Sequence, residues 1–168
     1  LEISDVDRHV YESVELRVAQ HPSETEVFLV TRLLAFALEW SPDLSFGPGL
    51  CVPDEPALSA SDPIGRLLTW IDIGAPSADR IHRASKAADA VSIYSHKPLD
   101  HVRNELGKRS IHRADELRII VIPHELLEPL AERIGRKNQW SVMRIDGVVT
   151  VTVGDEAFSA ELAAVGVS

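Results

Sequence analysis

The sequence has little cysteine, no long apolar run and no excess of basic residues, and each shortage excludes a class of protein. Cys51 is the one cysteine in 168 residues, which excludes an internal disulfide and fits a reducing compartment. No apolar run approaches the roughly 20 residues of a membrane-spanning helix. The formal net charge of −9 argues against an obligate, salt-driven nucleic-acid binder, which is usually basic. We therefore expect a cytoplasmic protein with no membrane segment.

Common catalytic signatures are missing as well. The sequence contains no Gly-x-Ser-x-Gly, P-loop, Cys-x-x-Cys or complete Gly-x-Gly-x-x-Gly, so the most frequent hydrolase, NTPase and dinucleotide-binding motifs do not apply. Residues 124–128 (His-Glu-Leu-Leu-Glu) come close to the zinc-binding helix motif, but Glu128 stands where the second histidine is needed. We interpret this segment as an exposed first helical turn, where acids are favoured.

The length and the 45% hydrophobic content suffice for one compact domain, and we expect residues 1–168 to form a single domain. Apolar periodicity predicts a mixed α/β architecture, with a central mixed sheet flanked by helices and antiparallel hairpins at both ends. The expected strands lie at residues 1–3, 10–18, 67–73, 91–94, 117–122, 139–145, 148–153 and 156–162. The expected helices lie at 23–40, 77–88, 98–108 and from 123 onward, the last kinked or restarted at Pro129.

Local patterns predict further detail in the first half of the chain. Ser23-Glu24-Thr25-Glu26 has the pattern of a capping box, with Ser23 as the N-cap and Glu26 reaching back to it. A loop rich in glycine and proline is expected over residues 41–63. The strand at 67–73 is apolar on both sides, so it should be central and covered on both faces. The buried face of the first helix is predicted to carry Phe28, Leu29, Leu33, Phe36, Ala37 and Trp40.

Positive charge is concentrated in one stretch of this acidic chain. Residues 80–118 hold nine of the 17 Lys and Arg and five of the 26 acids, which leaves a net charge of +4 there and −13 elsewhere. A basic face of this kind attracts a polyanion such as nucleic acid if the side chains converge in space. The alternative is a set of solvated helical faces with no ligand.

Four acids are candidates for chemistry: Glu24, Asp54, Glu55 and Asp72. Asp72 ends the strand predicted to be buried on both faces, where a carboxylate must be hydrogen-bonded, paired with a cation or bound to a metal. A hairpin-like approach of residues 54–55 to that strand would bring a second carboxylate beside Asp72. Carboxylates facing one point repel each other unless a cation joins them, and Mg²⁺ or Mn²⁺ suits an all-oxygen site.

Each acid also has a structural explanation. Asp72 is equally suited to cap the following helix or to pair with Arg32 or Arg80. Asp54 and Glu55 suit a proline-bounded turn, in which they satisfy backbone amides. Glu24 lies where a first helical turn is expected, and acids are favoured there in any case.

The candidate acids lie in His21-Pro22-Ser23-Glu24-Thr25, in Asp54-Glu55-Pro56-Ala57-Leu58 and in residues 70–76. These segments, with others along the chain, resemble the bacterial YaeQ family over nearly the whole chain. That resemblance implies a restriction-endonuclease-like PD-(D/E)XK core, which is a mixed central sheet flanked by helices with an acidic metal site at strand ends. The family's activity is not firmly known, so the resemblance implies a fold and a site more strongly than a reaction. The matching segments are His21-Pro22-Ser23-Glu24-Thr25, Arg32-Leu33-Leu34-Ala35, Gly49-Leu50, Asp54-Glu55-Pro56-Ala57-Leu58, Asp62, Gly65, residues 70–76, Arg80-Ile81, Ala84 and Asp146-Gly147.

The resemblance assigns roles to the same acids. Pro53-Asp54 matches the first half of the motif with Glu55 beside it, Asp72 is the second acid, and Glu24 lies at the start of the first helix. The motif lysine has no match, because no Asp/Glu-x-Lys triplet occurs in the sequence. In the family a basic pair on the following helix stands in for it, and here that pair is His82-Arg83. Lys86 lies one helical turn later. We assign to it the role of the motif lysine, which is to position the water that attacks the phosphate in a hydrolytic reaction.

Three functions follow as hypotheses. The first is a Mg²⁺- or Mn²⁺-dependent phosphodiesterase acting on nucleic acid, in which Arg80, Arg83 and Arg32 bind the phosphate. The second is a catalytically inactive nuclease-like module that binds nucleic acid or protein through residues 80–118. The third is an acidic cluster that only stabilises the fold. We also interpret Cys51 as a small apolar residue and not as a nucleophile.

Overall fold

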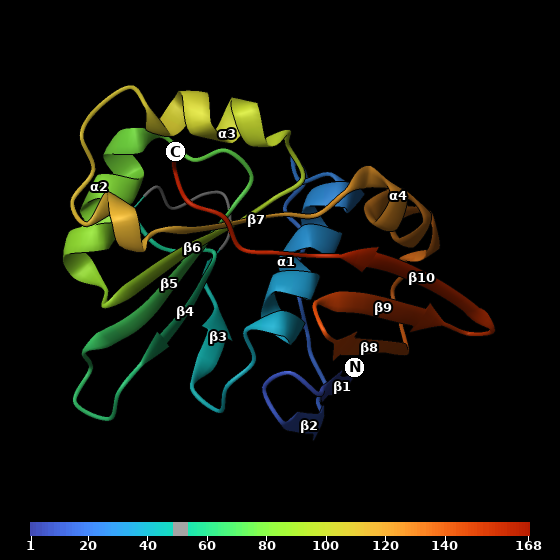
Figure 1. The fold of residues 1–168 in the computed structure, drawn as a ribbon. Coiled ribbons are helices and arrows are strands. Elements are labelled where there is room, and N and C mark those ends of the chain that lie inside the picture. The colour runs from blue at the N-terminus through green and yellow to red at the C-terminus, as the bar shows by residue number, and fades with distance from the viewer. Residues whose placement is uncertain (49–53) are drawn as a thin grey trace.

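Two five-stranded sheets lie on either side of a buried helix in this computed structural model (Figure 1), which describes residues 1–48 and 54–168. The described elements in chain order are β1 (Glu2–Asp5), β2 (Val10–Ser13), α1 (Glu26–Leu38), β3 (Leu44–Phe46), β4 (Leu58–Ser61), β5 (Leu67–Ile73), α2 (Ala78–Ala87), β6 (Ala90–Ser95), α3 (Leu99–Leu106), a short 3-10 helix (Ala114–Glu116), β7 (Arg118–Val121), α4 (His124–Arg133), β8 (Trp140–Ile145), β9 (Val148–Val153) and β10 (Glu156–Glu161). No helix in these residues is long and apolar enough to cross a membrane.

The terminal hairpins join into one sheet, with the strand order β10-β9-β8-β1-β2. Strand β1 pairs in parallel with β8, from Glu2 opposite Ser141 to Asp5 opposite Arg144, and the other pairs of this sheet are antiparallel. The antiparallel hairpins expected at both ends are therefore confirmed, whereas the expectation of one central sheet is wrong, because the strands form two sheets. The two hairpins share a sheet because each buries one apolar face against α1.

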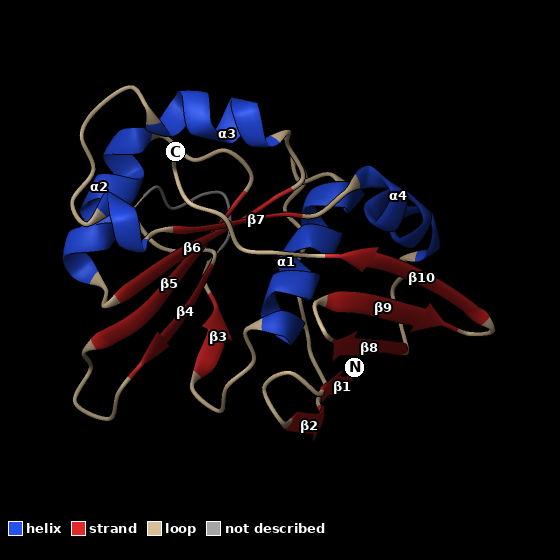
Figure 2. Cartoon of the chain, in the orientation of Figure 1, coloured by secondary structure: helices blue, strands red, loops and turns tan. Residues whose placement is uncertain are grey.

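The second sheet has the order β3-β4-β5-β6-β7. Its strands β5, β6 and β7 are parallel and are connected through α2 and α3, as Figure 2 shows. The central position predicted for residues 67–73 is confirmed. The loop predicted over residues 41–63 is wrong in part, because β3 and β4 lie within it and pair antiparallel with each other and with β5.

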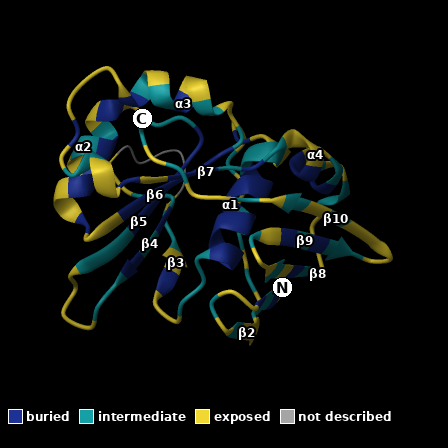
Figure 3. Ribbon diagram, in the orientation of Figure 1, coloured by how far each residue is buried: buried dark blue, intermediate teal, exposed yellow. Residues whose placement is uncertain are grey.

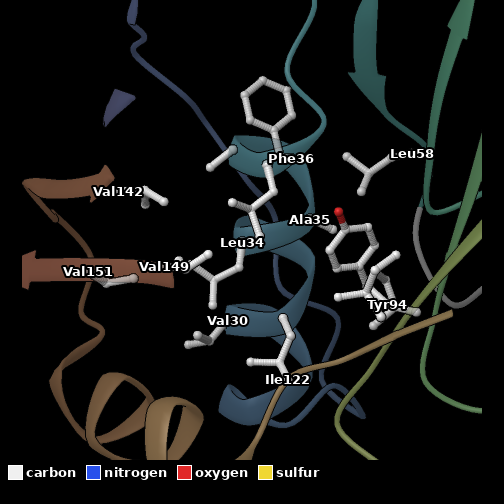
Figure 4. Packing of buried hydrophobic residues seen from close by; sticks show 14 of the residues in the cluster. Val30, Leu34, Ala35, Phe36, Leu58, Tyr94, Ile122, Val142, Val149 and Val151 are labelled. Carbon is white, nitrogen blue, oxygen red and sulfur yellow. The ribbon is translucent and has the colours of Figure 1, made fainter. Parts of the chain in front are cut away.

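Helix α1 is buried on nearly all sides, because the two sheets cover it from opposite directions (Figure 3). Figure 4 shows Val142 and Val149 on one side of this helix and Leu58 and Tyr94 on the other. The sequence-based prediction of a single buried face on α1 therefore covers too few residues. Residues buried beyond that prediction are Val30, Thr31, Arg32, Leu34, Ala35 and Leu38, whereas Phe28, Leu33 and Trp40 are half-buried. A helix that is apolar all round belongs inside a protein.

The parallel strands separate two cores by alternation. Ile71 and Ile73 of β5 belong to the core around α1, whereas Trp70 packs in a second core with residues of α2 and α3. Successive side chains of a strand point to opposite faces, so Asp72 shares the face of Trp70 and points toward α2. This alternation decides which helix meets the carboxylate.

Three local expectations in the described residues are corrected. The N-cap of α1 is Thr25 and not Ser23, and its Oγ1 accepts from the N–H of Phe28 at 3.1 Å. The strand β2 ends at Ser13 and not near residue 18, because Val14 and Leu16 pack on the core without a neighbouring strand. Helix α4 continues through Pro129 as one element, so it does not restart there, and the predicted kink stays a prediction.

Candidate functional site

A cleft of about 470 Å³ lies at the carboxyl ends of β5 and β6. The carboxyl edge of parallel strands is the usual place for ligands in such sheets. Gly74, in a left-handed conformation (φ +90°), leads the chain from β5 toward α2, and its N–H donates to the Tyr94 carbonyl at 2.9 Å. The cleft is lined by Phe28, Arg32, Glu55, Ala57, Asp72, Ile73, Gly74, Ala75, Pro76, Arg80, His96, Lys97 and His101.

Asp72 and Arg80 form a bidentate ion pair at one side of this cleft. Arg80 Nε donates to Asp72 Oδ2 at 2.6 Å, and Arg80 Nη2 donates to Asp72 Oδ1 at 2.9 Å. Asp72 is only 2% exposed, and the guanidinium of Arg80 also lies over the Trp70 ring, 5.5 Å from its centroid. Of the partners considered for this buried carboxylate, the structure selects Arg80.

Arg80 also connects the segment around Glu55 to β5. Its Nη2 donates to the Glu55 carbonyl at 2.5 Å, and β4 runs antiparallel to β5 with Leu58 opposite Ile71. The expected hairpin-like approach of this segment to Asp72 is therefore confirmed. The Asp54 carboxylate instead accepts from Arg83 Nη1 at 2.9 Å, between two exposed side chains. Cys51 and the predicted motif residue Pro53 lie outside the described residues.

Glu24 and Arg32 form a second, fully buried ion pair. Arg32 Nη2 donates to Glu24 Oε1 and to the Ala19 carbonyl, each at 2.9 Å. Glu24 precedes the helix, because Thr25 is the N-cap, so the predicted place of Glu24 in the first turn is wrong. The pair ties the segment before α1 to the helix and leaves Arg32 with its charge compensated at the cleft wall.

The four predicted acids do not fit a shared metal in this arrangement. Asp72, Glu24 and Asp54 each pair with a different arginine, and Glu55 lines the cleft as an exposed residue. Across residues 1–48 and 54–168, no group of three or more His, Cys, Asp or Glu is placed to hold a metal ion. Magnesium or manganese binding stays a prediction.

The segment that follows β6 supplies cleft residues that the motifs did not indicate. His96, Lys97 and His101 line the cleft from this segment and from α3. The His96 ring meets the Phe28 ring edge to face, with centroids 5.8 Å apart and an interplanar angle of 76°. Burial, and then the charges of Lys97 and His124, lower the pKa of His96. A usable sequence signal existed, since Ser95-His96-Lys97 directly follows a predicted buried strand.

Lys86, the lysine predicted to position the attacking water, lies outside the cleft. Lys86 is an exposed residue in the last turn of α2 and is not among the residues that line the cleft. The neighbouring His82 accepts from the N–H of His112 at 3.0 Å through its Nδ1. Lys97 is therefore the lysine at the cleft among the described residues.

The basic stretch 80–118 is largely compensated in the folded protein. Within the described part of the chain, ion pairs to carboxylates engage its cations Arg80, Arg83, Lys108, Arg109, Arg113 and Arg118. This pattern agrees with solvated helical faces over most of the stretch. Lys97 and His101 are members of the stretch that reach the cleft.

Comparison with known proteins decides the family. The family model of the YaeQ protein matches residues 1–162. The chain belongs to the YaeQ family. The uncharacterized YaeQ protein of Escherichia coli K12 is 37% identical over 95 residues, which are 56% of this chain and 52% of that protein. The uncharacterized YaeQ protein of Salmonella typhi is 36% identical over a segment of the same length. The matched segment thus spans about half the length of these curated relatives.

Two solved YaeQ structures match nearly the whole chain. The YaeQ protein from Pseudomonas syringae superposes with a TM-score of 0.88 and 35% identity, covering 98% of this chain and 91% of that chain. The YaeQ protein from Xanthomonas axonopodis pv. citri gives a TM-score of 0.86 and 31% identity, covering 97% and 93%. The mixed α+β architecture is therefore shared with solved YaeQ proteins, and the family resemblance drawn from the motifs is confirmed. The PD-(D/E)XK core stays a prediction.

Proposed function

We propose that this YaeQ protein binds nucleic acid through the cleft at the carboxyl ends of β5 and β6, and that it does so without cleaving it. The observation that supports this proposal is the convergence of Arg80, Lys97 and His101 on one cleft from two helices and a loop. A lysine ammonium and an imidazole that line one cleft suit a phosphate group, beside an arginine that already neutralises the buried Asp72.

The charge of the lining supports the same ligand. Arg32, Arg80 and Lys97 line the cleft. Glu24 compensates the charge of Arg32 and Asp72 that of Arg80, so among the described lining residues Lys97 is the cation that remains to meet a phosphate, although the whole chain carries a net charge of −9. Arg80 neutralises Asp72, so this buried carboxylate does not repel a phosphate. The proposed interaction is local, because an acidic surface beyond the cleft disfavours a long nucleic-acid footprint.

Binding of labelled DNA and RNA oligonucleotides, followed by fluorescence anisotropy, tests the proposal. We expect Lys97→Ala to weaken binding about tenfold, because one charge-assisted phosphate contact is worth about 1.4 kcal/mol or more. The matched control is Lys108→Ala, since Lys108 pairs with Glu105 at 2.7 Å on an exposed surface. Equal affinity of wild type and Lys97→Ala, or equal losses in both variants, would contradict the proposal.

A metal-dependent phosphodiesterase is the second candidate. Asp72, Glu55 and Lys97 line the same cleft, and this candidate requires a metal ion to displace Arg80 from Asp72. Calorimetric titration of Mn²⁺ and Mg²⁺ into wild type and into Asp72→Asn separates the two candidates. Metal binding and oligonucleotide cleavage that both disappear in a folded Asp72→Asn variant would establish the phosphodiesterase. Oligonucleotide binding without metal binding or cleavage supports the first proposal.

A further inference from the structure

The lining of the cleft combines an apolar part and a charged part. Phe28, Ala57, Ile73, Ala75 and Pro76 supply apolar surface to its lining, whereas Arg80, Lys97 and His101 supply the positive and polar groups. Its volume of about 470 Å³ lies in the range of sites that enclose a small molecule. A site built only for a phosphate needs the charged part and has no use for the apolar one.

Aromatic rings occupy the apolar part. Phe28 comes from α1 and His96 from the end of β6, and their rings pack edge to face. Both residues line the cleft. The lowered pKa of His96 favours the neutral imidazole, which acts as an aromatic surface more than as a phosphate-binding cation. Nucleic-acid bases stack on such rings, with little dependence on the identity of the base.

We infer, on the basis of the proposed function, that the cleft takes one unstacked nucleotide of a single strand. The base lies against Phe28 and His96, and its phosphate lies at Lys97 and His101. A duplex keeps its bases paired and stacked, so only its phosphates reach the charged part, and the apolar part then stays uncovered. Single-stranded nucleic acid satisfies both parts.

The first test needs no variant. A labelled 12-nucleotide single strand, the same strand with one abasic position at each of several sites, and the matching blunt duplex are titrated against the wild-type protein. We expect the single strand to bind at least about tenfold more tightly than the duplex, and abasic substitution at one position to weaken it about fivefold or more. Equal affinity for single strand, abasic strand and duplex would overturn the inference.

A variant pair locates the effect. Phe28→Leu keeps apolar volume but removes the ring, and it should weaken single-strand binding about fivefold or more while leaving weak duplex binding unchanged. The matched control is Phe158→Leu, because Phe158 lies in β10 beneath Arg133, away from the cleft lining. Should Phe28→Leu fail to fold, His96→Ala gives the same comparison.

The outcomes distinguish this inference from the proposed function. Duplex and single strand that bind equally, with loss in Lys97→Ala and none in Phe28→Leu, leave phosphate binding standing and overturn the single-nucleotide inference. Binding of neither polymer overturns both. Preference for the single strand with loss in Phe28→Leu, and none in the Phe158→Leu control, supports both.

Discussion

Buried carboxylates of this protein pair with arginines. Asp72 pairs with Arg80, Glu24 with Arg32, and Asp5 with both Arg8 and Arg144. A buried charge without a partner costs several kcal/mol, and the planar guanidinium satisfies both carboxylate oxygens at once. At the scale of single residues, the pair of Asp5 with Arg144 joins segments that are distant in the chain, since these residues lie in the neighbouring strands β1 and β8.

Removing Arg80 from its ion pair with Asp72 should destabilise the folded protein. We expect Arg80→Met to lower the free energy of unfolding by about 3–5 kcal/mol, because it leaves the Asp72 charge buried and unpaired. In the Asp72→Asn background the same change should cost much less. Urea denaturation of the four proteins measures the difference, and equal costs in both backgrounds would refute the pairing.

Stability should depend on pH through Asp5. Burial acts to raise the pKa of Asp5, but hydrogen bonds from Arg144 and Arg8 outweigh it and lower the pKa below the ordinary value of 3.8. The unfolded state therefore binds a proton before the native state does as the pH falls. The contribution of Asp5 is complete above pH 3.8 and is lost as the pH falls through the lowered native pKa. Urea melts of wild type and Asp5→Asn between pH 2 and 6 should converge at the acidic end.

Helix α1 illustrates how an element depends on its surroundings at both ends. Thr25 caps its N-terminus within the local sequence. Its last turn contains no basic residue, and distant arginines donate to carbonyls at this end. Arg144 donates to the carbonyl of Leu38, the last helical residue, and Arg8 donates to the Trp40 carbonyl just past the helix, each at 3.1 Å. Positive charge at a helix C-terminus is favourable, so tertiary contacts supply what the helix sequence does not.

The corrected N-cap is directly testable. Thr25→Ala should lower the free energy of unfolding by about 1 kcal/mol, because the Phe28 N–H loses its acceptor. Ser23→Ala is the matched control and should have little effect, since the Ser23 hydroxyl bonds the exposed His21 ring. Thermal or urea unfolding of both variants decides between them, and a larger loss for Ser23→Ala would restore the capping box.

At the scale of the whole molecule, one core joins the two sheets. Residues of α1, of the sheet that contains β8 and β9, and of the sheet that contains β5 and β6 belong to a single apolar cluster. A contiguous core unfolds as a unit in most small proteins. The expected single domain over residues 1–168 therefore predicts one unfolding transition.

Single-tryptophan variants can follow each sheet separately. Trp140 reports on the sheet of β8, and Trp70 reports on the sheet of β5, both 6% exposed. With the other two tryptophans replaced by Phe, the two urea transitions should share one midpoint. Leu34→Ala in α1 should lower the free energy of unfolding reported by each tryptophan by about 2–5 kcal/mol. Separate midpoints would divide the chain into two folding units.

The charge of the whole molecule limits how nucleic acid binds. The net charge of −9 and the ion pairs along residues 80–118 leave few cations for phosphates outside the cleft. We expect a plot of log affinity against log salt concentration to have a slope no steeper than about −2, as for one or two phosphate contacts. A slope near −5 or steeper would indicate an extended basic face instead.

The sequence by itself determined features that depend on neighbouring residues. Alternating and continuous apolar runs located β5 and the three C-terminal strands, and Asp146-Gly147 supplied the two left-handed residues of the β8–β9 turn (φ +49° and +77°). Ser77 was placed at the start of α2, where it is the N-cap. The unusual buried position of Asp72 was also evident from its strand alone. Each of these follows from periodicity, turn chemistry or capping within a few residues.

Only the tertiary structure decided which faces meet. The parallel pairing of β1 with β8 joins residues far apart in the chain, and no spacing in either strand encodes it. The second apolar side of α1 likewise has no explanation within the helix, because a second sheet, formed by other parts of the chain, covers it. At the cleft, β-strand order brought Lys97 and His96 into the same lining as Asp72 and left Lys86 outside. Local patterns describe one element at a time, whereas a site depends on contacts between elements, which the chain makes only on folding.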